Sequence, residues 1–295
     1  MDNVVIVGPG RMGLALGAAL KNAGAVERLI FYGRGMEPPP HPLFDGPDAA
    51  EYRVGPQAVA SGTTILILAV PDARLAEVAY DLSRAGEGPP GCVVLHLAGA
   101  LTTEALAPLH SVGYPVGSMH PLQAIADPWH SGDRLLGAAY ALAGEPAAIK
   151  AGRRLVNALN GLPLVIPPNA RPVYHASAVA ASNYLIALLA FAVRLMMEAG
   201  VSESDSIEAL LPLMKGTLDN LEHLGVAHAL TGPIARGDAD TVRLHLTRLS
   251  ASDRQLYSRL GLELLRVARA AGLDMEKANE LEQLLERSIP DAPAH

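Results

Sequence analysis

Short apolar runs alternate with stretches of mixed polarity through the first half of the chain, and this alternation stops near residue 168. The runs are rich in valine, isoleucine and leucine, which favours β-strands. They cover residues 4–8, 28–33, 63–70, 92–99, 114–121, 138–144 and 162–168. Helical stretches separate most of them. This alternation is typical of an α/β domain with a doubly wound, mainly parallel sheet.

The second half of the chain has a different pattern. From about residue 170 onward the spacing of apolar residues is helical, and the strand signals disappear. Breaks are expected near Gly200, Gly225, Gly232 and Gly272. We predict two domains, residues 1–168 with the sheet and residues 169–295 as an all-α domain. Residues 35–47 contain too many prolines for a helix and are predicted to form a loop.

Residues 176–197 are apolar and long enough to span a bilayer. Polar side chains interrupt them at Ser177, Ser182, Asn183 and Arg194. An all-round apolar helix also suits a protein core, so we predict a buried central helix and no membrane partner. The N-terminus has no basic segment or cleavage pattern, which indicates a cytoplasmic protein.

Composition narrows the functional classes. Half of the 295 residues are hydrophobic and 18% are charged, which is typical of a globular protein. The net charge of −7 argues against non-specific nucleic-acid binding. The single cysteine, Cys92, allows no internal disulfide, and we interpret it as a buried structural thiol. No metal site is expected, because the ten histidines show no metal-ligand spacing.

A glycine-rich turn follows the first strand run. In "GPGRMG", residues 8–13, the spacing of Gly8, Gly10 and Gly13 allows a tight turn, close approach of a pyrophosphate and close helix packing. Amides at the helix start would face the phosphates. We therefore predict a dinucleotide site. It comprises Gly8, Pro9, Gly10, Arg11, Met12 and Gly13. A glycine-rich turn without a ligand is the alternative interpretation.

The end of the second strand run indicates which dinucleotide binds. An acidic residue there would accept hydrogen bonds from the adenosine ribose of NAD(H). This chain has Gly33 and Arg34 instead. A guanidinium can pair with a 2′-phosphate, so we predict NADP(H), with Arg11 assisting. An ordinary solvated side chain is the alternative for Arg34.

Further candidates lie where later strands end, because ligands bind at the carboxyl edge of such sheets. The lining predicted for the nicotinamide end of the cofactor consists of Ala69, Val70, Pro71, Leu97, Ala98 and Gly99. His120 stands at the next strand exit, where it could bind substrate or position water. A structural hydrogen bond to a loop carbonyl is equally compatible with His120. For His96, inside its strand, we favour a structural role.

The long apolar helix offers a second group. Helical geometry places His175 and Ser182 on one stripe with Asn183 beside it. We hypothesise that His175 donates a proton while Ser182 and Asn183 orient the substrate or the imidazole. Simple packing at a helix end is the alternative for His175. Arg236, between two turns in "TGPIARGD", is a candidate clamp for a substrate carboxylate or else a surface arginine.

Several motifs together carry a resemblance to a known family. They are "GPGRMG", "ILAVPDARLAEVA", "HLAGAL", "GSMHPLQAI", "YHASAVAASNYLIALL" and "ALTGPIARGD". Over nearly its whole length the chain resembles a bacterial family that joins a Rossmann-like NADP-binding domain to a helical C-terminal domain of unknown function. More distantly it is similar to pyrroline-5-carboxylate reductases, ketopantoate reductases, β-hydroxyacid dehydrogenases and prephenate dehydrogenases. The resemblance implies a 6-phosphogluconate-dehydrogenase-like arrangement, with substrate bound between the domains and a homodimer formed through the helical one.

One departure from those enzymes limits the resemblance. β-Hydroxyacid dehydrogenases and ketopantoate reductases carry a lysine on the first helix after the sheet. The lysines of this chain are Lys21, Lys150, Lys215 and Lys277. Lysine chemistry is therefore absent from that helix.

These observations predict an NADP-dependent oxidoreductase that transfers a hydride between nicotinamide and a small carbonyl, imine or hydroxy substrate, expected to carry a carboxylate. The alternative is a non-catalytic binding protein that responds to NADP(H). The sequence does not separate imine from keto-acid chemistry.

Overall fold

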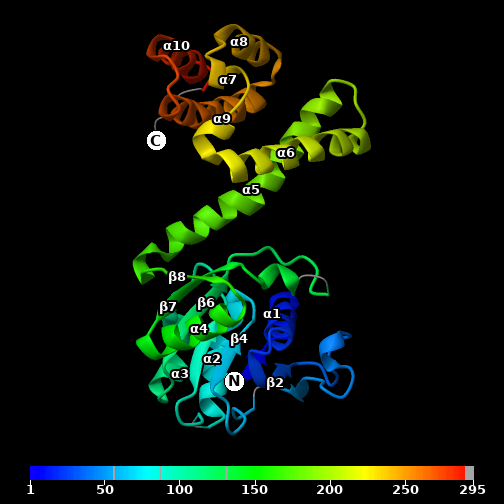
Figure 1. Ribbon diagram of the computed structural model, residues 1–295, viewed down its shortest axis with the longest axis vertical. Coiled ribbons are helices and arrows are strands. Elements are labelled where there is room, and N and C mark those ends of the chain that lie inside the picture. The colour runs from blue at the N-terminus through cyan, green and yellow to red at the C-terminus, as the bar shows by residue number, and fades with distance from the viewer. Residues whose placement is uncertain (56, 87, 130–131, 290–295) are drawn as a thin grey trace. The chain divides into compact units, whose positions relative to one another are not determined.

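The computed structural model describes residues 1–55, 57–86, 88–129 and 132–289 (Figure 1). The chain divides into two compact units, Met1–Ile186 and Ala187–His295. This division falls inside a long helix, later than residue 168, where the strand pattern ends.

The first unit is built on one sheet, as predicted. Its strands are β1 (Asp2–Val7), β2 (Val26–Gly33), β3 (Glu51–Val54), β4 (Ile65–Leu68), β5 (Val93–His96), β6 (Val116–Pro121), β7 (Ala139–Gly144) and β8 (Leu162–Val165). Their order is β3-β2-β1-β4-β5-β6-β7-β8, and all neighbours are parallel except β6 and β7. Every predicted run contains a strand. Only β3 was missed, because this short edge strand, "EYRV", has no fully buried residue.

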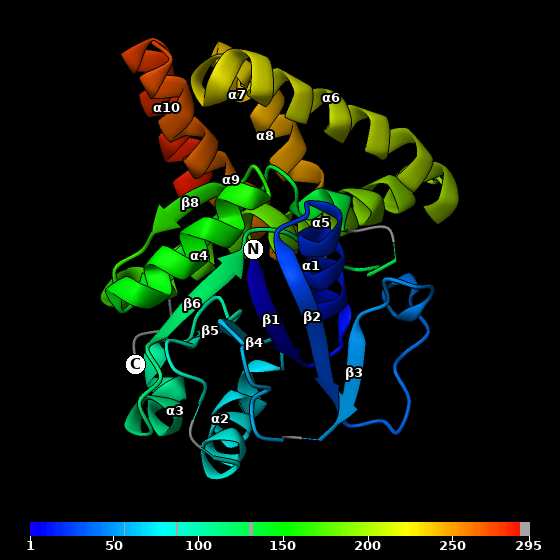
Figure 2. The same cartoon turned by 60° about the horizontal axis from the view of Figure 1, so that its bottom comes forward.

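Helices cover both faces of this sheet (Figure 2). Helices α1 (Arg11–Asn22) and α4 (Pro146–Ala158) pack on the face that includes Val4 and Ile6. Helices α2 (Leu75–Arg84) and α3 (Ala107–Ser111) pack on the face that includes Val5 and Val7. Because both faces are buried, the central strands are continuously apolar rather than alternating.

Short 3-10 helices occupy several connections in the first unit. They are η1 (Pro42–Phe44), η2 (Asp72–Arg74), η3 (Thr103–Leu106), η4 (Asp133–Leu135) and η5 (Pro168–Ala170). The proline-rich segment 35–47 is a loop that contains only η1, as predicted. Cys92 is buried, also as predicted, and burial raises the pKa of its thiol to about 12.

The second unit is helical. It contains the end of α5 (Arg171–Glu198), then α6 (Glu203–Ala229), α7 (Pro233–Arg236), α8 (Ala239–Arg248), α9 (Ala251–Ala270) and α10 (Met275–Glu286). Side chains of Ser202, Asp238, Ser250 and Asp274 cap the N-termini of α6, α8, α9 and α10. The predicted glycine breaks all have positive φ, and Gly225 distorts α6 from within. A small core of α7–α10 includes Val242, Leu265 and Leu281.

Helix α5 differs from its prediction, because it is not buried within the single chain. Its most apolar stretch has a mean hydropathy of 1.8, yet only 11% of that stretch is buried. By length and composition this helix could cross a membrane, and it is the only such helix in the described part of the chain. Apolar residues occupy all faces of α5, so the periodicity of the sequence could not show which surface covers this helix. Exposed examples are Val173, Tyr184, Ile186 and Met197.

Candidate active site

The glycine turn after β1 has the geometry that phosphate binding requires. Gly8 adopts φ +104°, and a Cβ there would lie 2.6 Å from the carbonyl oxygen of Ala69. A Cβ on Gly13 would lie 2.2 Å from the Gly8 carbonyl oxygen. Gly10, by contrast, begins α1 with open space where a side chain would stand. Two glycines are therefore needed for packing, and the third leaves room for a ligand.

Helix α1 presents its N-terminus to this open space. The first-turn amides of a helix have no partners within it, and Gly10 provides no side-chain cap. The first turn also contains no acidic residue that would repel a phosphate. Residues 8–13 thus fit the pyrophosphate of a dinucleotide, because free amides and the positive helix end face an unobstructed approach.

The two arginines predicted to select NADP(H) are solvent-exposed. Arg34 directly follows β2, and Arg11 begins α1. Within the described ranges neither guanidinium forms an ion pair that would neutralise it. Gly33 packs closely under Tyr52, since a Cβ there would lie 2.3 Å from the Tyr52 hydroxyl oxygen. That hydroxyl donates to the carbonyl of Gly35 at 2.8 Å, which fixes the backbone around Arg34.

The predicted nicotinamide lining lies at the carboxyl ends of β4 and β5. The amide of Ala69 bonds to Val7, which joins this segment to the glycine turn. Val70 is half-buried and Pro71 exposed, whereas Leu97 and Ala98 are buried in the two core layers of the sheet. Leu97 and Ala98 therefore also pack in the core, and the cofactor lining predicted for these six residues stays a prediction.

His120 and His175 come together as a pair. His120 is in β6, His175 is in the first turns of α5, and their ring centroids are 5.8 Å apart. Gly99 makes this possible, because a Cβ there would lie 2.3 Å from Nδ1 of His175 and 2.9 Å from Nε2 of His120. All three residues belong to the first unit. The structure thus joins two histidines that are distant in sequence at the sheet edge that carries the glycine turn.

Tyr174 completes this group, although no sequence pattern selected it. Its hydroxyl lies 2.7 Å from Nδ1 of His120, with the two rings edge to face at 5.7 Å. Burial raises the pKa of Tyr174, while the charge of Arg171 acts in the opposite direction. The only signal in the sequence was the adjacency of Tyr174 to His175, and tyrosine on an apolar helix usually indicates packing.

Arg171 is the second residue that sequence reasoning missed. It is 1% exposed, and its guanidinium donates to the hydroxyl of Ser118 at 2.9 Å and to the carbonyl of Ala98 at 2.6 Å. Both acceptors are neutral, and burial lowers the pKa of the guanidinium. Buried charges are usually paired with an opposite charge. A buried cation with neutral partners is instead a source of positive potential beside the histidines.

Burial and, to a smaller extent, that potential favour the neutral forms of His96 and His120. Burial, the charge of Arg171 and a smaller effect of His120 lower the pKa of His96 to about 4. Burial, then His175 and Arg171, lower the pKa of His120 to about 4 as well. His96 is fully buried and its Nδ1 accepts the amide of Ala98, in line with the structural role favoured from sequence. Within the described ranges no group of three or more His, Cys, Asp or Glu side chains could hold a metal ion.

Ser182 and Asn183 are engaged within α5 itself. The Ser182 hydroxyl lies 2.8 Å from the carbonyl oxygen of Ala178 and 2.9 Å from Oδ1 of Asn183. No hydrogen bond among the described residues joins either side chain to His175. Their proposed orienting role therefore stays a prediction.

Arg236 lies in the second unit on α7. Its side chain is exposed, and Nη2 is 3.9 Å from a carboxylate oxygen of Asp238. Asp238 in turn caps α8 through the amide of Thr241, as expected for this turn. The role of Arg236 as a carboxylate clamp stays a prediction.

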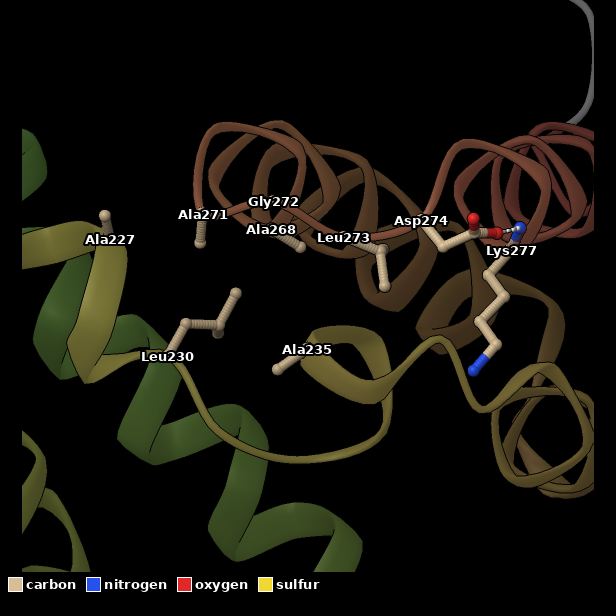
Figure 3. A pocket seen from close by; sticks show the side chains of 9 residues that line it. All are labelled: Ala227, Leu230, Ala235, Ala268, Ala271, Gly272, Leu273, Asp274 and Lys277. Carbon is tan, nitrogen blue, oxygen red and sulfur yellow. Dashed lines mark hydrogen bonds between the residues drawn. The ribbon is translucent and has the colours of Figure 1, made fainter.

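A separate pocket of about 290 Å³ lies in the second unit (Figure 3). It is formed by α6, α7 and the turn between α9 and α10, and most of the residues that line it are alanine or leucine, such as Leu230 and Leu273. Asp274 bonds to the backbone amide of Lys277, so its carboxylate serves the helix cap. The pocket contains none of the predicted site residues.

Comparison with protein families identifies two domains. Residues 2–121 match the model of a Rossmann-like domain, and residues 138–264 match a domain of unknown function, DUF2520. Over these two segments the chain matches a Rossmann-like domain followed by a DUF2520 domain. This is the composite architecture that the motifs suggested. No curated protein matches the sequence.

Solved structures share the fold. Protein TM1727 from Thermotoga maritima has a TM-score of 0.70 at 20% identity, covering 90% of this chain and 98% of that one. BF3122 from Bacteroides fragilis, named as a proposed NADP oxidoreductase, has 0.64 at 19%, covering 92% and 97%. The pyrroline carboxylate reductase from Plasmodium falciparum, solved with NADP bound, has 0.56 at 15%, covering 97% of each chain. The chain therefore has an oxidoreductase-like fold.

Proposed function

We propose that this protein is an NADP-dependent oxidoreductase that transfers a hydride between nicotinamide and a small carbonyl, imine or hydroxy compound. The observation that carries the proposal is the placement of two features at one edge of the sheet. The glycine turn of residues 8–13 follows β1, and the His120–Tyr174–His175 group lies at the ends of β5 and β6. Bound to that turn, NADPH would supply a hydride.

The structural neighbours support this proposal. One of them is named as a proposed NADP oxidoreductase, and another is named as a pyrroline carboxylate reductase with NADP bound. Exposed Arg34 and Arg11 support NADP(H) over NAD(H), because each offers a guanidinium that forms no ion pair with the described residues near the expected adenosine end. Buried Arg171 supports a substrate that carries a carboxylate, because its positive potential favours anions nearby. Arg236 remains the proposed clamp for that carboxylate.

We also propose that the protein is a cytoplasmic homodimer formed through the C-terminal domain. The exposed apolar side chains of α5 and α6 favour a second copy of the chain that packs against these helices. Arg194 on α5 forms an ion pair with the buried carboxylate of Asp253, and polar Ser182 and Asn183 interrupt the same helix. Charged and polar groups on one helix favour a protein cover over lipid.

The deciding experiment follows the absorbance of NADPH with a panel of 2-oxo acids, cyclic imines and aldehydes. Calorimetry with NADPH and NADH is run on the same protein, and His120→Asn serves as the matched variant. We expect NADPH uptake in both proteins and turnover only in the wild type. Uptake without any turnover across the panel would favour the non-catalytic NADP(H)-responsive protein. Absence of uptake would overturn both functions.

A further inference from the structure

The hydrogen bond between Tyr174 and His120 decides which nitrogen of the imidazole is free. Nδ1 is engaged with the tyrosine hydroxyl at 2.7 Å. Nε2 is therefore the atom that can meet a substrate, and it lies beside Gly99, where there is no side chain to cover it. When the tyrosine donates to Nδ1, the neutral ring carries its own proton on Nε2.

The surroundings of His120 disfavour an imidazolium. Arg171, His96 and His175 all face this region, and none carries a negative charge; Asp72 acts on Arg171 but does not pair with it. With its pKa near 4, His120 is neutral at pH 7. A neutral imidazole that gave up a proton alone would become an unfavourable anion. A second proton must therefore reach the ring as the first one leaves.

Tyr174 is placed to deliver that second proton. Its hydroxyl is the hydrogen-bond partner of Nδ1, and Arg171 precedes it on the same helix by less than one turn. Among the described residues, the guanidinium of Arg171 bonds to the neutral groups of Ser118 and Ala98, so its charge remains available to a nearby anion. A tyrosinate at position 174 would be that anion.

Resting on the proposed function, we propose that Tyr174 supplies the proton of the reaction through His120. As the substrate oxygen or nitrogen gains negative charge, it takes the proton from Nε2 of His120, so that in this proposal His120 is the donor in place of His175, the donor hypothesised from the sequence. The Nδ1 atom of the same ring takes the proton of Tyr174, and Arg171 stabilises the resulting tyrosinate. The cycle closes when Nδ1 returns its proton to Tyr174 and Nε2 takes one from water. The imidazole stays neutral throughout, and the net proton comes from solvent.

In this proposal His120 touches the substrate, whereas Tyr174 and Arg171 act through it as positioning residues. Their roles are distinguishable from simple packing because the tautomer of His120 depends on them. Nitrogen NMR of histidine-labelled protein reads that tautomer directly and requires neither cofactor nor substrate. Tyr184, an exposed tyrosine on the same helix, gives a matched control.

The experiment compares wild type, Tyr174→Phe, Tyr184→Phe, Arg171→Lys and Arg171→Gln by this NMR measurement across pH. We expect His120 of the wild type to carry its proton on Nε2. Tyr174→Phe should lose that preference, and Tyr184→Phe should keep it. Arg171→Gln should raise the pKa of His120 by about one unit or more. Arg171→Lys keeps the positive charge and should leave that pKa unchanged, and it provides the second variant if Arg171→Gln fails to fold.

Kinetics complete the test with the substrate found for the proposed function. Tyr174→Phe should lower kcat by about 100-fold or more, with KM and NADPH affinity nearly unchanged. A wild-type His120 protonated on Nδ1, or an unaltered kcat in Tyr174→Phe, would overturn the relay. Failure of the proposed function would show differently, as no turnover in any protein, and the NMR result would still decide the tautomer.

Discussion

Gly99 lies directly beneath His175, because a Cβ on Gly99 would come within 2.3 Å of Nδ1 of that histidine. Glycine at the end of β5 is therefore a requirement of the histidine pair as well as a feature of the predicted cofactor lining. The φ angle of Gly99 is not in the left-handed region, so the constraint comes from space alone.

Gly99→Ala is expected to displace His175 and His120 and to lower turnover strongly. Inserting a methyl group into such a packed place typically costs about 1–3 kcal/mol. We expect a lower free energy of unfolding in urea and shifted NMR signals of both histidines. Gly216→Ala, at a position on α6 with open space around it, is the control; it should leave the histidine signals in place and should not lower the free energy of unfolding, because alanine favours a helix more than glycine does. Unmoved histidine signals in the Gly99 variant would contradict the geometry.

The glycine turn makes opposite predictions for two of its members. Gly13→Ala should destabilise the protein without cofactor, because its Cβ would meet the Gly8 carbonyl oxygen at 2.2 Å. Gly10→Ala should change the stability of the free protein by no more than about 1 kcal/mol but weaken NADPH binding, because the methyl group fills the approach to α1. Thermal unfolding and NADPH calorimetry measure the two effects. Equal NADPH affinity in wild type and Gly10→Ala would place the cofactor elsewhere.

Arg34 is expected to set the preference for NADPH. Charge-assisted hydrogen bonds contribute about 1.5–3 kcal/mol, so Arg34→Ala should weaken NADPH binding by about 10- to 100-fold and leave NADH binding nearly unchanged. Arg28, which pairs with Glu51, provides the control for a general loss of positive charge. Calorimetry with both coenzymes gives the ratio. A parallel loss for NADPH and NADH would remove the selection role.

Acid is expected to destabilise the protein through His96. The folded state holds the pKa of this group at about 4, below its ordinary value of 6.5, so the unfolded chain binds the proton more readily. The stability that depends on neutral His96 is then fully present above about pH 6.5 and is lost as the pH falls toward 4. The loss should be on the order of 1–3 kcal/mol, measured by urea unfolding at pH 7 and pH 5.

His96→Asn should reduce this pH dependence, since asparagine can accept a hydrogen bond from the amide of Ala98 but cannot take up a proton. His110→Asn, at an exposed position, should retain it. The same slope in all three proteins would mean that other groups cause the acid sensitivity.

The exposed apolar helices lead to a prediction about assembly. Leu213 on α6 is 66% exposed in the single chain, and Leu244 on α8 is 59% exposed. If a second copy covers α5 and α6, Leu213→Asp should shift the molecular mass in light scattering from dimer toward monomer, whereas Leu244→Asp should not. A monomeric wild type would refute the proposed dimer.

The local pattern of the sequence was sufficient for the sheet and for the glycine turn. Continuous apolar runs such as residues 63–70 form strands buried on both faces, and the positive φ of Gly8 follows from the motif around it. These features depend on neighbours within a few residues. Edge strand β3 escaped detection because an edge strand buries too little to impose an apolar pattern.

The polar residues of the candidate site come together only in the tertiary structure. His120 precedes Tyr174 by 54 residues, and only the strand order and the start of α5 bring it together with Tyr174 and Arg171. A buried arginine with neutral partners has no signature in sequence, because its partners are a backbone carbonyl and one serine hydroxyl. The cover of α5 also lay beyond the sequence, since an apolar helix surface of this kind fits the core of its own chain and a second copy equally well.

Sequence alone thus determined the class of fold, the place of the glycine turn and the exposed arginine after β2, because each arises from local spacing and backbone conformation. The tertiary structure alone decided that His175 meets His120 over Gly99, that Tyr174 occupies Nδ1, and that Arg171 holds its charge beside them. The physical reason is that contact and burial, which set the electrostatics of these groups, depend on strands and helices far apart along the chain.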